Sequence, residues 1–194
     1  SLKRHVIIKK LSIRGNNSIK ERFKREAQIL LDLNNPNIVH LFDYFTEGSY
    51  HYIVLEFVDG MSLDKLLKKQ VMLSPQASML IFRDSLRALK FAHDNGVVHR
   101  DIKPGNILIS RHGDIKLADF GIASSEREED DTSLTQSGVT LGTPSYMPPE
   151  QFDDSHSVDK RADIYAMGIM LYEMVTGTKP YAGNFAPETI AKKY

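Results

Sequence analysis

The stretch His99-Arg100-Asp101-Ile102-Lys103-Pro104-Gly105-Asn106 decides the fold and the chemistry of this chain. It places a carboxylate, a lysine and a carboxamide within the six positions from Asp101 to Asn106. A second acidic group follows in Asp119-Phe120-Gly121, at a distance along the chain that a hairpin of two short strands would span. Two acids and an amide around one lysine suit a phosphate that carries a bound metal ion.

The bulk composition restricts the classes of protein to which the chain can belong. Its 194 residues fit one domain, or one large domain cut short, and the first residue is not Met, which suggests a piece of a longer protein. A formal net charge of zero leaves no positive field for nucleic acid, and the absence of cysteine excludes disulfides and thiolate metal sites. No apolar run reaches the about 20 residues of a membrane helix. We therefore expect a cytoplasmic chain without a membrane segment or nucleic-acid partner, while a longer parent protein could still carry a membrane anchor.

The first third of the chain is rich in strand signals. An apolar run before Lys9 reads as a strand, Ser18 and Glu21 form a capping box that begins a helix, and Asn34-Asn35-Pro36 ends it. Residues 38–45 and 50–57 then read as two strands joined by a turn. Asp59-Gly60 interrupts this pattern, as expected of a hinge between two lobes.

The remainder of the chain reads as mainly helical. Ser74-Pro75 begins a helix that runs to Gly96, with an apolar face made of Met79, Phe82, Leu86 and Leu89. Residues 107–109 and 114–118 read as a hairpin, and residues 163–175 as a helix that is apolar on nearly every face and so expected to be buried. A small strand-rich part followed by a helical part indicates an α+β fold in two lobes.

The two quoted motifs resemble those of one enzyme family. The eight residues that end at Asn106 are similar to the catalytic loop of protein kinases, H-R-D-x-K-x-x-N, and Asp119-Phe120-Gly121 is similar to that family's metal-binding D-F-G. The resemblance implies the bilobal protein-kinase fold, with a small β-rich N-lobe in residues 1–58 (strand 3, helix C, strands 4 and 5) and a mainly α-helical C-lobe in residues 59–194 (catalytic loop, activation segment, helix F). Both lobes are expected to be truncated, since no Gly-rich loop precedes Lys9 and the chain stops soon after residues 163–175. We expect such a fragment alone to aggregate and to be weakly active or inactive.

The resemblance also assigns roles within the quoted stretch. Asp101 would be the base that orients the substrate hydroxyl and accepts its proton, and Lys103 would stabilise the transferring phosphoryl group. Asn106 and Asp119 would hold Mg²⁺ or Mn²⁺, because both offer hard oxygen ligands. The alternative is that these are turn-forming polar residues around Pro104-Gly105.

Lys9 and Glu26 are expected to pair. Glu26 lies within the apolar stripe of the first predicted helix, where a carboxylate is costly unless a cation meets it. Val6-Ile7-Ile8-Lys9 resembles the family's V-A-I-K, in which the lysine holds the α- and β-phosphates of ATP. The alternative is a surface lysine beside a half-exposed glutamate, and Lys10 would replace Lys9 if the strand register slipped by one residue.

The adenine site is expected at the hinge, where residues 52–58 resemble the hinge sequence of kinases. The resemblance makes Leu55 the gatekeeper, gives the backbone of Glu56 and Val58 hydrogen bonds to adenine, and places Leu108 beneath the ring. Ile7 stands where the family carries a small alanine above the ring, so its additional methyl groups would crowd adenine. The alternative is that residues 52–58 form a plain core strand.

Residues outside these sets are expected to support the site. His99 and Phe120 would stack with Leu30 and Leu41 in the core, and His99 is not expected to bind metal because no second His stands at ligand spacing. Asp163 resembles the helix F aspartate that hydrogen-bonds the backbone of the catalytic loop, which is a structural role.

The segment before Glu150 is expected to bind the protein substrate. Residues 141–150 resemble the G-T-P-x-Y-M-A-P-E segment of serine/threonine kinases, and Thr143 together with Lys103 favours Ser or Thr over Tyr as acceptor. Thr135 or Ser137 is expected to be phosphorylated and to contact Arg100, since an arginine before the base marks kinases that loop phosphorylation activates.

The sequence therefore predicts a serine/threonine protein kinase, of bacterial type, that transfers the γ-phosphoryl group of ATP to protein Ser/Thr hydroxyls. Its partners would be those protein substrates and a second kinase copy for trans-autophosphorylation. One alternative is a pseudokinase, favoured by Ile7 and the missing Gly-rich loop, and another is a small-molecule kinase on the same scaffold. The catalytic set argues against the pseudokinase because it is complete: Lys9, Glu26, Asp101, Asn106 and Asp119.

Overall fold

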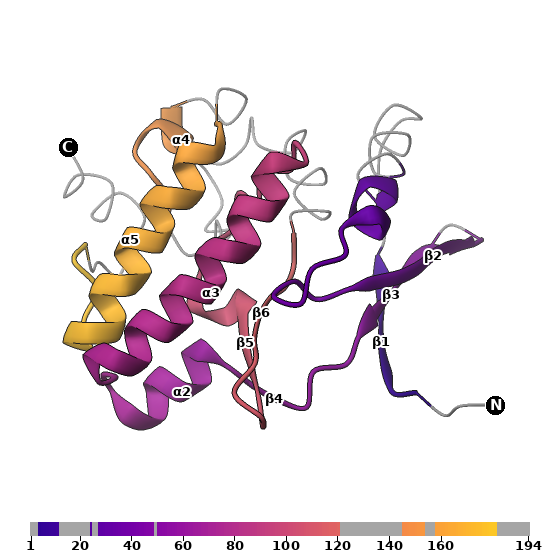
Figure 1. Ribbon diagram of the computed structural model, residues 1–194. Helices are drawn as coiled ribbons and strands as arrows, with labels where there is room; N and C mark the ends of the chain where they lie inside the picture. The colour runs from indigo at the N-terminus through magenta and orange to yellow at the C-terminus, as the bar shows by residue number, and fades with distance from the viewer. Residues whose placement is uncertain are drawn as a thin grey trace.

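The computed structural model describes residues 4–11, 24, 27–48, 50–120, 145–153 and 158–181 (Figure 1). A sheet of three strands lies on one side and a group of helices on the other, with a second small sheet between them. This is the α+β arrangement in two parts that the sequence predicts. Within the described residues, no helix combines the length and the apolar character needed to cross a bilayer.

The first sheet is antiparallel, in the order β1-β3-β2. Its strands are β1 (Val6–Leu11), β2 (Leu41–Glu47) and β3 (Tyr50–Glu56). The turn between β2 and β3 contains Gly48 at φ 61°, a left-handed conformation that glycine adopts without a Cβ clash. The register pairs Ile7 with Leu55 and Lys9 with Ile53, so Ile7 and Lys9 point to the same face of the sheet.

The predicted strand at residues 38–45 is wrong at its beginning. β2 starts at Leu41, because Ile38 instead forms a parallel bridge to Leu117 of the second sheet. The Leu117 N–H donates to the Asn37 carbonyl at 2.8 Å, and the Val39 N–H donates to the Leu117 carbonyl at 2.9 Å. Residues 37–39, which lie between the helical residues 27–32 and β2, thus connect the first sheet to the second through these contacts.

The second part of the described chain is mainly helical. α3 (Pro75–Asp94) begins as predicted, since the Ser74 side chain accepts a hydrogen bond from the Ala77 N–H and Pro75 occupies the first helical position. α5 (Lys160–Thr176) ends at Gly177, which has φ 73°. β4 and α2 were not predicted, because each is too short for a clear periodic pattern. The other elements of this part are β4 (Gly60–Ser62), α2 (Leu63–Gln70), η1 (Pro104–Asn106), β5 (Ile107–Ser110), β6 (Ile115–Leu117) and α4 (Glu150–Asp153).

Packing of α3 against α5 forms the core of the helical part (Figure 1). Leu89 of α3 and Met167 of α5 are almost fully buried. The apolar face predicted for α3 is buried only in part, since Leu89 is 1% exposed and Met79 is 54% exposed. One prediction of burial is wrong. α5 is not buried on all sides, since Ile164 is 51% exposed on the side that no described element covers.

The second sheet brings the predicted site residues together. Its order is β4-β5-β6, and the predicted hairpin is confirmed as β5 and β6. Asn106 immediately precedes β5 and Asp119 follows β6, and the Ala118 N–H donates to the Asn106 carbonyl at 2.8 Å. The hairpin therefore returns Asp119 to the stretch that contains Asp101.

Candidate active site

Lys9 and Asp119 meet between the two sheets. The Lys9 side chain, from β1, places its Nζ against Oδ1 of Asp119, which follows β6. The two side chains are 40% and 43% exposed, so the contact lies at an open edge of the fold. The fold thus brings together two of the predicted site residues, Lys9 and Asp119. Glu26, the predicted partner of Lys9, lies outside the described residues, so that pairing stays a prediction.

Asp101 lies between two donors of its own loop. Its Oδ2 accepts hydrogen bonds from Lys103 Nζ at 2.7 Å and from Asn106 Nδ2 at 3.1 Å. The same Asn106 nitrogen donates to the Asp101 carbonyl at 2.7 Å. Asn106 is only 4% exposed, and the turn η1 holds it in place through its N–H, which donates to the Lys103 carbonyl at 2.9 Å. The loop thus gathers a carboxylate, an ammonium and an amide at one point.

A buried carboxylate of α5 supports this loop, as the sequence predicts. Asp163 is 1% exposed, and its two oxygens accept hydrogen bonds from the backbone N–H groups of His99 and Arg100, both at 2.8 Å. Its Oδ2 also lies 2.8 Å from Nε2 of His93, near the end of α3. Sequence reasoning missed His93, and the signal that could have found it is a histidine in the last turn of a predicted helix just before the loop.

His99 joins Asp101 to the residue before Asp119. The Asp101 N–H donates to Nδ1 of His99 at 3.3 Å, and Nε2 of His99 lies 2.9 Å from the Ala118 carbonyl. Nδ1 therefore accepts and Nε2 donates, which describes a neutral imidazole ring. Complete burial lowers the pKa of His99, which agrees with the neutral form.

The predicted packing role of His99 is confirmed. Its ring centroid lies 4.6 Å from that of Phe120, and Leu30 and Leu41 belong to the same buried core. The contacts of the His99 ring that the structure describes are this ring contact and its hydrogen bonds to the backbone.

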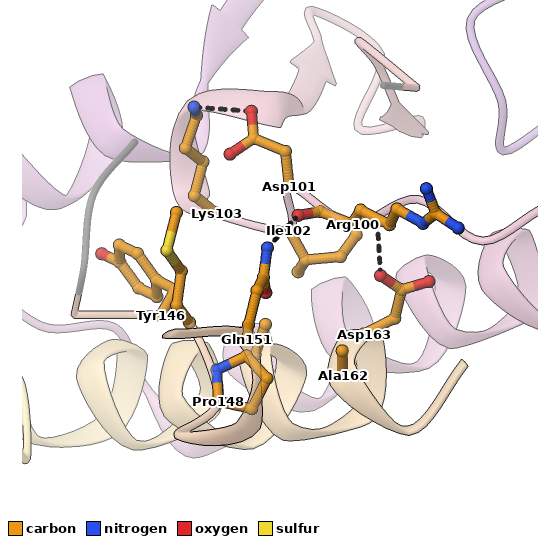
Figure 2. Close-up of a pocket in the computed structure, with 11 residues that line it drawn as sticks. Arg100, Asp101, Ile102, Lys103, Tyr146, Pro148, Gln151, Ala162 and Asp163 are labelled. Carbon is orange, nitrogen blue, oxygen red and sulfur yellow. Dashed lines mark hydrogen bonds and ion pairs between the residues drawn. The ribbon is translucent and has the colours of Figure 1, made fainter. Parts of the chain in front are cut away.

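A pocket separates the loop from the segment that leads into α4. Figure 2 shows Asp101 and Lys103 on one side of this pocket and Tyr146 and Pro148 on another. Tyr146 is 5% exposed and its hydroxyl donates to the carboxylate of Glu173 on α5. Burial, followed by that hydrogen bond, raises the pKa of Tyr146, so the phenol stays protonated. The predicted substrate residue Thr143 and the predicted phosphosites Thr135 and Ser137 lie outside the described residues.

Comparison with known families identifies this arrangement. The model of the protein kinase domain family matches residues 1–193. The chain belongs to the protein kinase domain family. The predicted family is therefore confirmed.

Several bacterial kinases are similar to the chain. The chain is 41% identical over 177 residues to serine/threonine-protein kinase PknB of Mycobacterium leprae, covering 89% of this chain and 28% of that protein. It is 40% identical over 187 residues to PknL of Mycobacterium tuberculosis, covering 95% and 46%. It is 38% identical over 195 residues to a probable serine/threonine-protein kinase of Clostridium perfringens, covering 100% and 28%. The chain thus spans less than half the length of these relatives.

A solved kinase structure confirms the predicted bilobal α+β fold. The crystal structure of Rad53 1–466 in complex with AMP-PNP matches with a TM-score of 0.78, at 28% sequence identity. The match covers 96% of this chain and 45% of that chain. The small three-stranded sheet and the mainly helical part agree with the two lobes of that fold.

Glu56, the last residue of β3 and one of the predicted hinge residues, is hydrogen-bonded to His40 and to Lys116 of the second sheet. The Glu56 N–H donates to the His40 carbonyl at 2.9 Å, so a hydrogen bond from adenine to Glu56 would have to use the Glu56 carbonyl. The Glu56 carboxylate accepts from Lys116 Nζ of β6 at 3.0 Å and from the His40 N–H at 3.2 Å. Sequence reasoning missed Lys116, although its place between the buried Ile115 and Leu117 marks it as a strand residue that points outward.

Proposed function

We propose that this chain is the catalytic core of a serine/threonine protein kinase, which transfers the γ-phosphoryl group of ATP to Ser or Thr hydroxyls of proteins. The observation that carries the proposal is the gathering of Lys9, Asp119 and the Asp101 loop, which come from both lobes. The relatives named as serine/threonine-protein kinases support the reaction, and the Rad53 complex with AMP-PNP supports the nucleotide.

Asp101 would orient the substrate hydroxyl and accept its proton. Phosphoryl transfer passes through a loose transition state, so placing the hydroxyl matters more than removing its proton. Lys103, at 2.7 Å, offsets the charge of Asp101 and would also meet the charge of the transferring phosphoryl group. The Asn106 amide limits rotation of the Asp101 carboxylate through its bond to the same oxygen.

Asn106 and Asp119 fit a site for Mg²⁺, or for Mn²⁺ in its place. Mg²⁺ prefers oxygen ligands and is usually held by one or two carboxylates together with phosphate oxygens, so two protein ligands suffice. The amide nitrogen of Asn106 already donates to Asp101, which leaves Oδ1 as the end that can bind a cation. When bound, the ion would neutralise charge on the β- and γ-phosphates.

Lys9 would hold the α- and β-phosphates of ATP. Its ammonium already lies against Asp119, so the phosphates and the metal-binding carboxylate would share one edge of the site. Glu26 would orient Lys9, as the sequence predicts.

The adenine ring would bind between the lobes at the hinge. Ile7 and Leu55 are register partners on β1 and β3 and would pack against the ring, with Leu108 of β5 beneath it. The Glu56 carbonyl and the Val58 N–H would hydrogen-bond adenine. Ile7 is 39% exposed and carries more bulk than the family's alanine, so it would reduce the space for the ring.

Substrate choice and regulation complete the proposal, and their support comes from the sequence. Thr143 with Lys103 would select Ser and Thr acceptors in protein substrates. Phosphate on Thr135 or Ser137 would pair with Arg100, placed there by a second kinase copy in a dimer. These steps would take place in the cytoplasm.

Replacing Asp101 by Asn in the full-length protein tests the proposed reaction. Asn keeps the size of the side chain but cannot accept a proton as a carboxylate does, so phosphotransfer to Ser/Thr peptides should fall about 100-fold or more. Stabilisation by MgATP in a thermal shift assay should persist, because Asp101 does not bind the nucleotide. Asp94→Asn, at the exposed end of α3, is the matched control and should leave both properties unchanged.

Two results would contradict the proposal. Phosphotransfer that survives Asp101→Asn would remove the proposed base. A wild-type protein that MgATP stabilises but that phosphorylates no Ser or Thr would instead be a pseudokinase.

A further inference from the structure

Side chains of two helices contact the backbone of Arg100 at its two ends. Arg100 has φ 64°, a left-handed conformation that a residue with a Cβ adopts only when its surroundings hold it there. Asp163 of α5 accepts a hydrogen bond from the Arg100 N–H at 2.8 Å. Gln151 of α4 reaches the other end of the residue, where its Nε2 donates to the Arg100 carbonyl at 3.5 Å (Figure 2).

The carbonyl that Gln151 contacts belongs to the peptide bond that enters Asp101. The N–H of that same peptide bond donates to Nδ1 of His99 at 3.3 Å. His99 and Gln151 therefore restrain one peptide plane, the first from the core and the second from α4. Rotation of this plane would swing the Asp101 side chain away from its position beside Lys103.

Gln151 belongs to the segment that forms the substrate side of the pocket. Its N–H donates to the Pro148 carbonyl at 3.1 Å, which closes a turn between Pro148 and α4. Pro148 and Tyr146 line the same pocket as Asp101, so a peptide that presses on this segment also presses on the turn that carries Gln151.

We propose that Gln151 is a positioning residue that couples the seating of residues 145–149 to the orientation of Asp101. The inference rests on the kinase activity proposed above. A separation of 3.5 Å is at the long end for a hydrogen bond, and such bonds in active sites are often long until substrate tightens them. Seating of a peptide shortens the bond and fixes the peptide plane that carries Asp101.

Two substitutions separate hydrogen bonding from the filling of space. Gln151→Met keeps the length and approximate volume of the side chain but removes the N–H donor. Gln151→Glu keeps the shape but places a carboxylate oxygen against the Arg100 carbonyl. Gln70→Met, at the exposed end of α2, makes the same chemical change away from the site and serves as the matched control.

Kinetics of the full-length protein give the first readout. With a degenerate Ser/Thr peptide library as substrate, we expect Gln151→Met to lower kcat by about 5- to 20-fold and Gln151→Glu to lower it further, since small misplacements of a catalytic group cost rates of this order. The KM for ATP and the thermal midpoint should stay as in the wild type, because neither the nucleotide site nor the core is touched. Gln70→Met should match the wild type in all of these.

Hydrogen exchange gives a second readout that does not depend on phosphotransfer. Peptides that cover residues 99–103 should exchange faster in Gln151→Met than in the wild type, and should be unchanged in Gln70→Met. If the wild-type protein shows no phosphotransfer, the proposed function is rejected, and hydrogen exchange alone then tests the positioning role of Gln151. Unchanged exchange overturns the inference, as does an unchanged kcat in an active enzyme. A lower thermal midpoint with a parallel rise in the KM for ATP also overturns it, because Gln151 would then be a packing residue.

Discussion

The Lys9 ammonium, on β1, contacts the Asp119 carboxylate, which follows β6. The two residues stand 110 positions apart, and their sheets share no strand. Both side chains are about 40% exposed, and an ion pair exposed to this extent adds at most about 1 kcal/mol to the free energy of unfolding. The pair is therefore better suited to binding a charged ligand than to holding the lobes together.

Lys9→Met should for this reason separate activity from stability. We expect phosphotransfer to fall by about 100-fold or more, because the phosphates of ATP lose their ammonium partner. The urea midpoint of the kinase domain should shift by no more than the equivalent of about 1 kcal/mol. Lys10→Met is the matched control, since Lys10 points to the opposite face of β1 and its Nζ lies 3.5 Å from the centre of the Tyr50 ring. If Lys10→Met abolished phosphotransfer and Lys9→Met did not, the two lysines would have to exchange roles.

Unlike Lys9→Met, Asp163→Ala should destabilise the domain strongly. The substitution leaves the backbone N–H groups of His99 and Arg100, and the ring nitrogen of His93, without their buried acceptor. Each buried donor left unpaired costs about 1–3 kcal/mol, so we expect a total loss of about 3–5 kcal/mol. Urea unfolding followed by circular dichroism measures this loss. Asp94→Ala, at an exposed position, should stay within about 0.5 kcal/mol of the wild type, and a comparable effect of the two variants would argue against the role of Asp163.

The sequence predicts those parts of the site that lie on one continuous stretch or across one hairpin. Asp101 and Asn106 share a loop, and the β5–β6 hairpin returns Asp119 to it, so local patterns suffice for these residues. Gln151 of α4 contacts the Arg100 carbonyl across 51 positions of sequence, and His93 of α3 contacts Asp163 of α5 across 70 positions, so no local pattern pairs these residues with their partners. Their roles depend on how α3, α4 and α5 pack, which a periodic pattern does not specify.

Errors in the predicted fold have the same physical origin. The apolar pattern around Ile38 indicates a strand, because pattern reasoning sees only neighbouring residues. In the structure Ile38 bridges to Leu117 of the second sheet, and this tertiary contact ends the pairing that β2 would otherwise extend. Leu63 and Leu67 of α2 are buried, but a helix of 8 residues offers too few turns for a distinct period.

Burial of His99 makes the domain sensitive to acid. Burial lowers the pKa of His99, and the carboxylates of Asp163, Asp101 and Asp119 with the Ala118 carbonyl only partly oppose that effect. In the unfolded chain the pKa of the ring is about 6.5. Below that pH the unfolded state therefore binds a proton that the folded state does not bind. The stability from this group is therefore present above about pH 6.5 and is lost as the pH falls, with a slope of up to about 1.4 kcal/mol per pH unit.

Comparison with a variant that cannot titrate isolates this effect. His99→Phe keeps an aromatic ring in the core against Phe120 but carries no proton. The free energy of unfolding, measured in urea from pH 7 to pH 5, should fall less steeply for His99→Phe than for the wild type. Equal slopes for the two proteins over this range would show that His99 does not carry the acid sensitivity.

Gly60 and Gly168 differ in what an added methyl group would meet. A Cβ at Gly60 of β4 would lie 1.9 Å from the Ile109 carbonyl oxygen on the paired strand β5, whereas a Cβ at Gly168 of α5 would meet no heavy atom within 4 Å in the described part of the chain. Gly60→Ala must force β4 away from β5 and should cost about 1–3 kcal/mol or more of stability. Gly168→Ala replaces glycine within a helix and should add about 0.8–1.0 kcal/mol. Because β5 follows directly from Asn106, Gly60→Ala should also lower phosphotransfer, and Gly168→Ala should not. Urea midpoints and initial rates measure both effects, and a shift of the two midpoints in the same direction would contradict the assigned contacts.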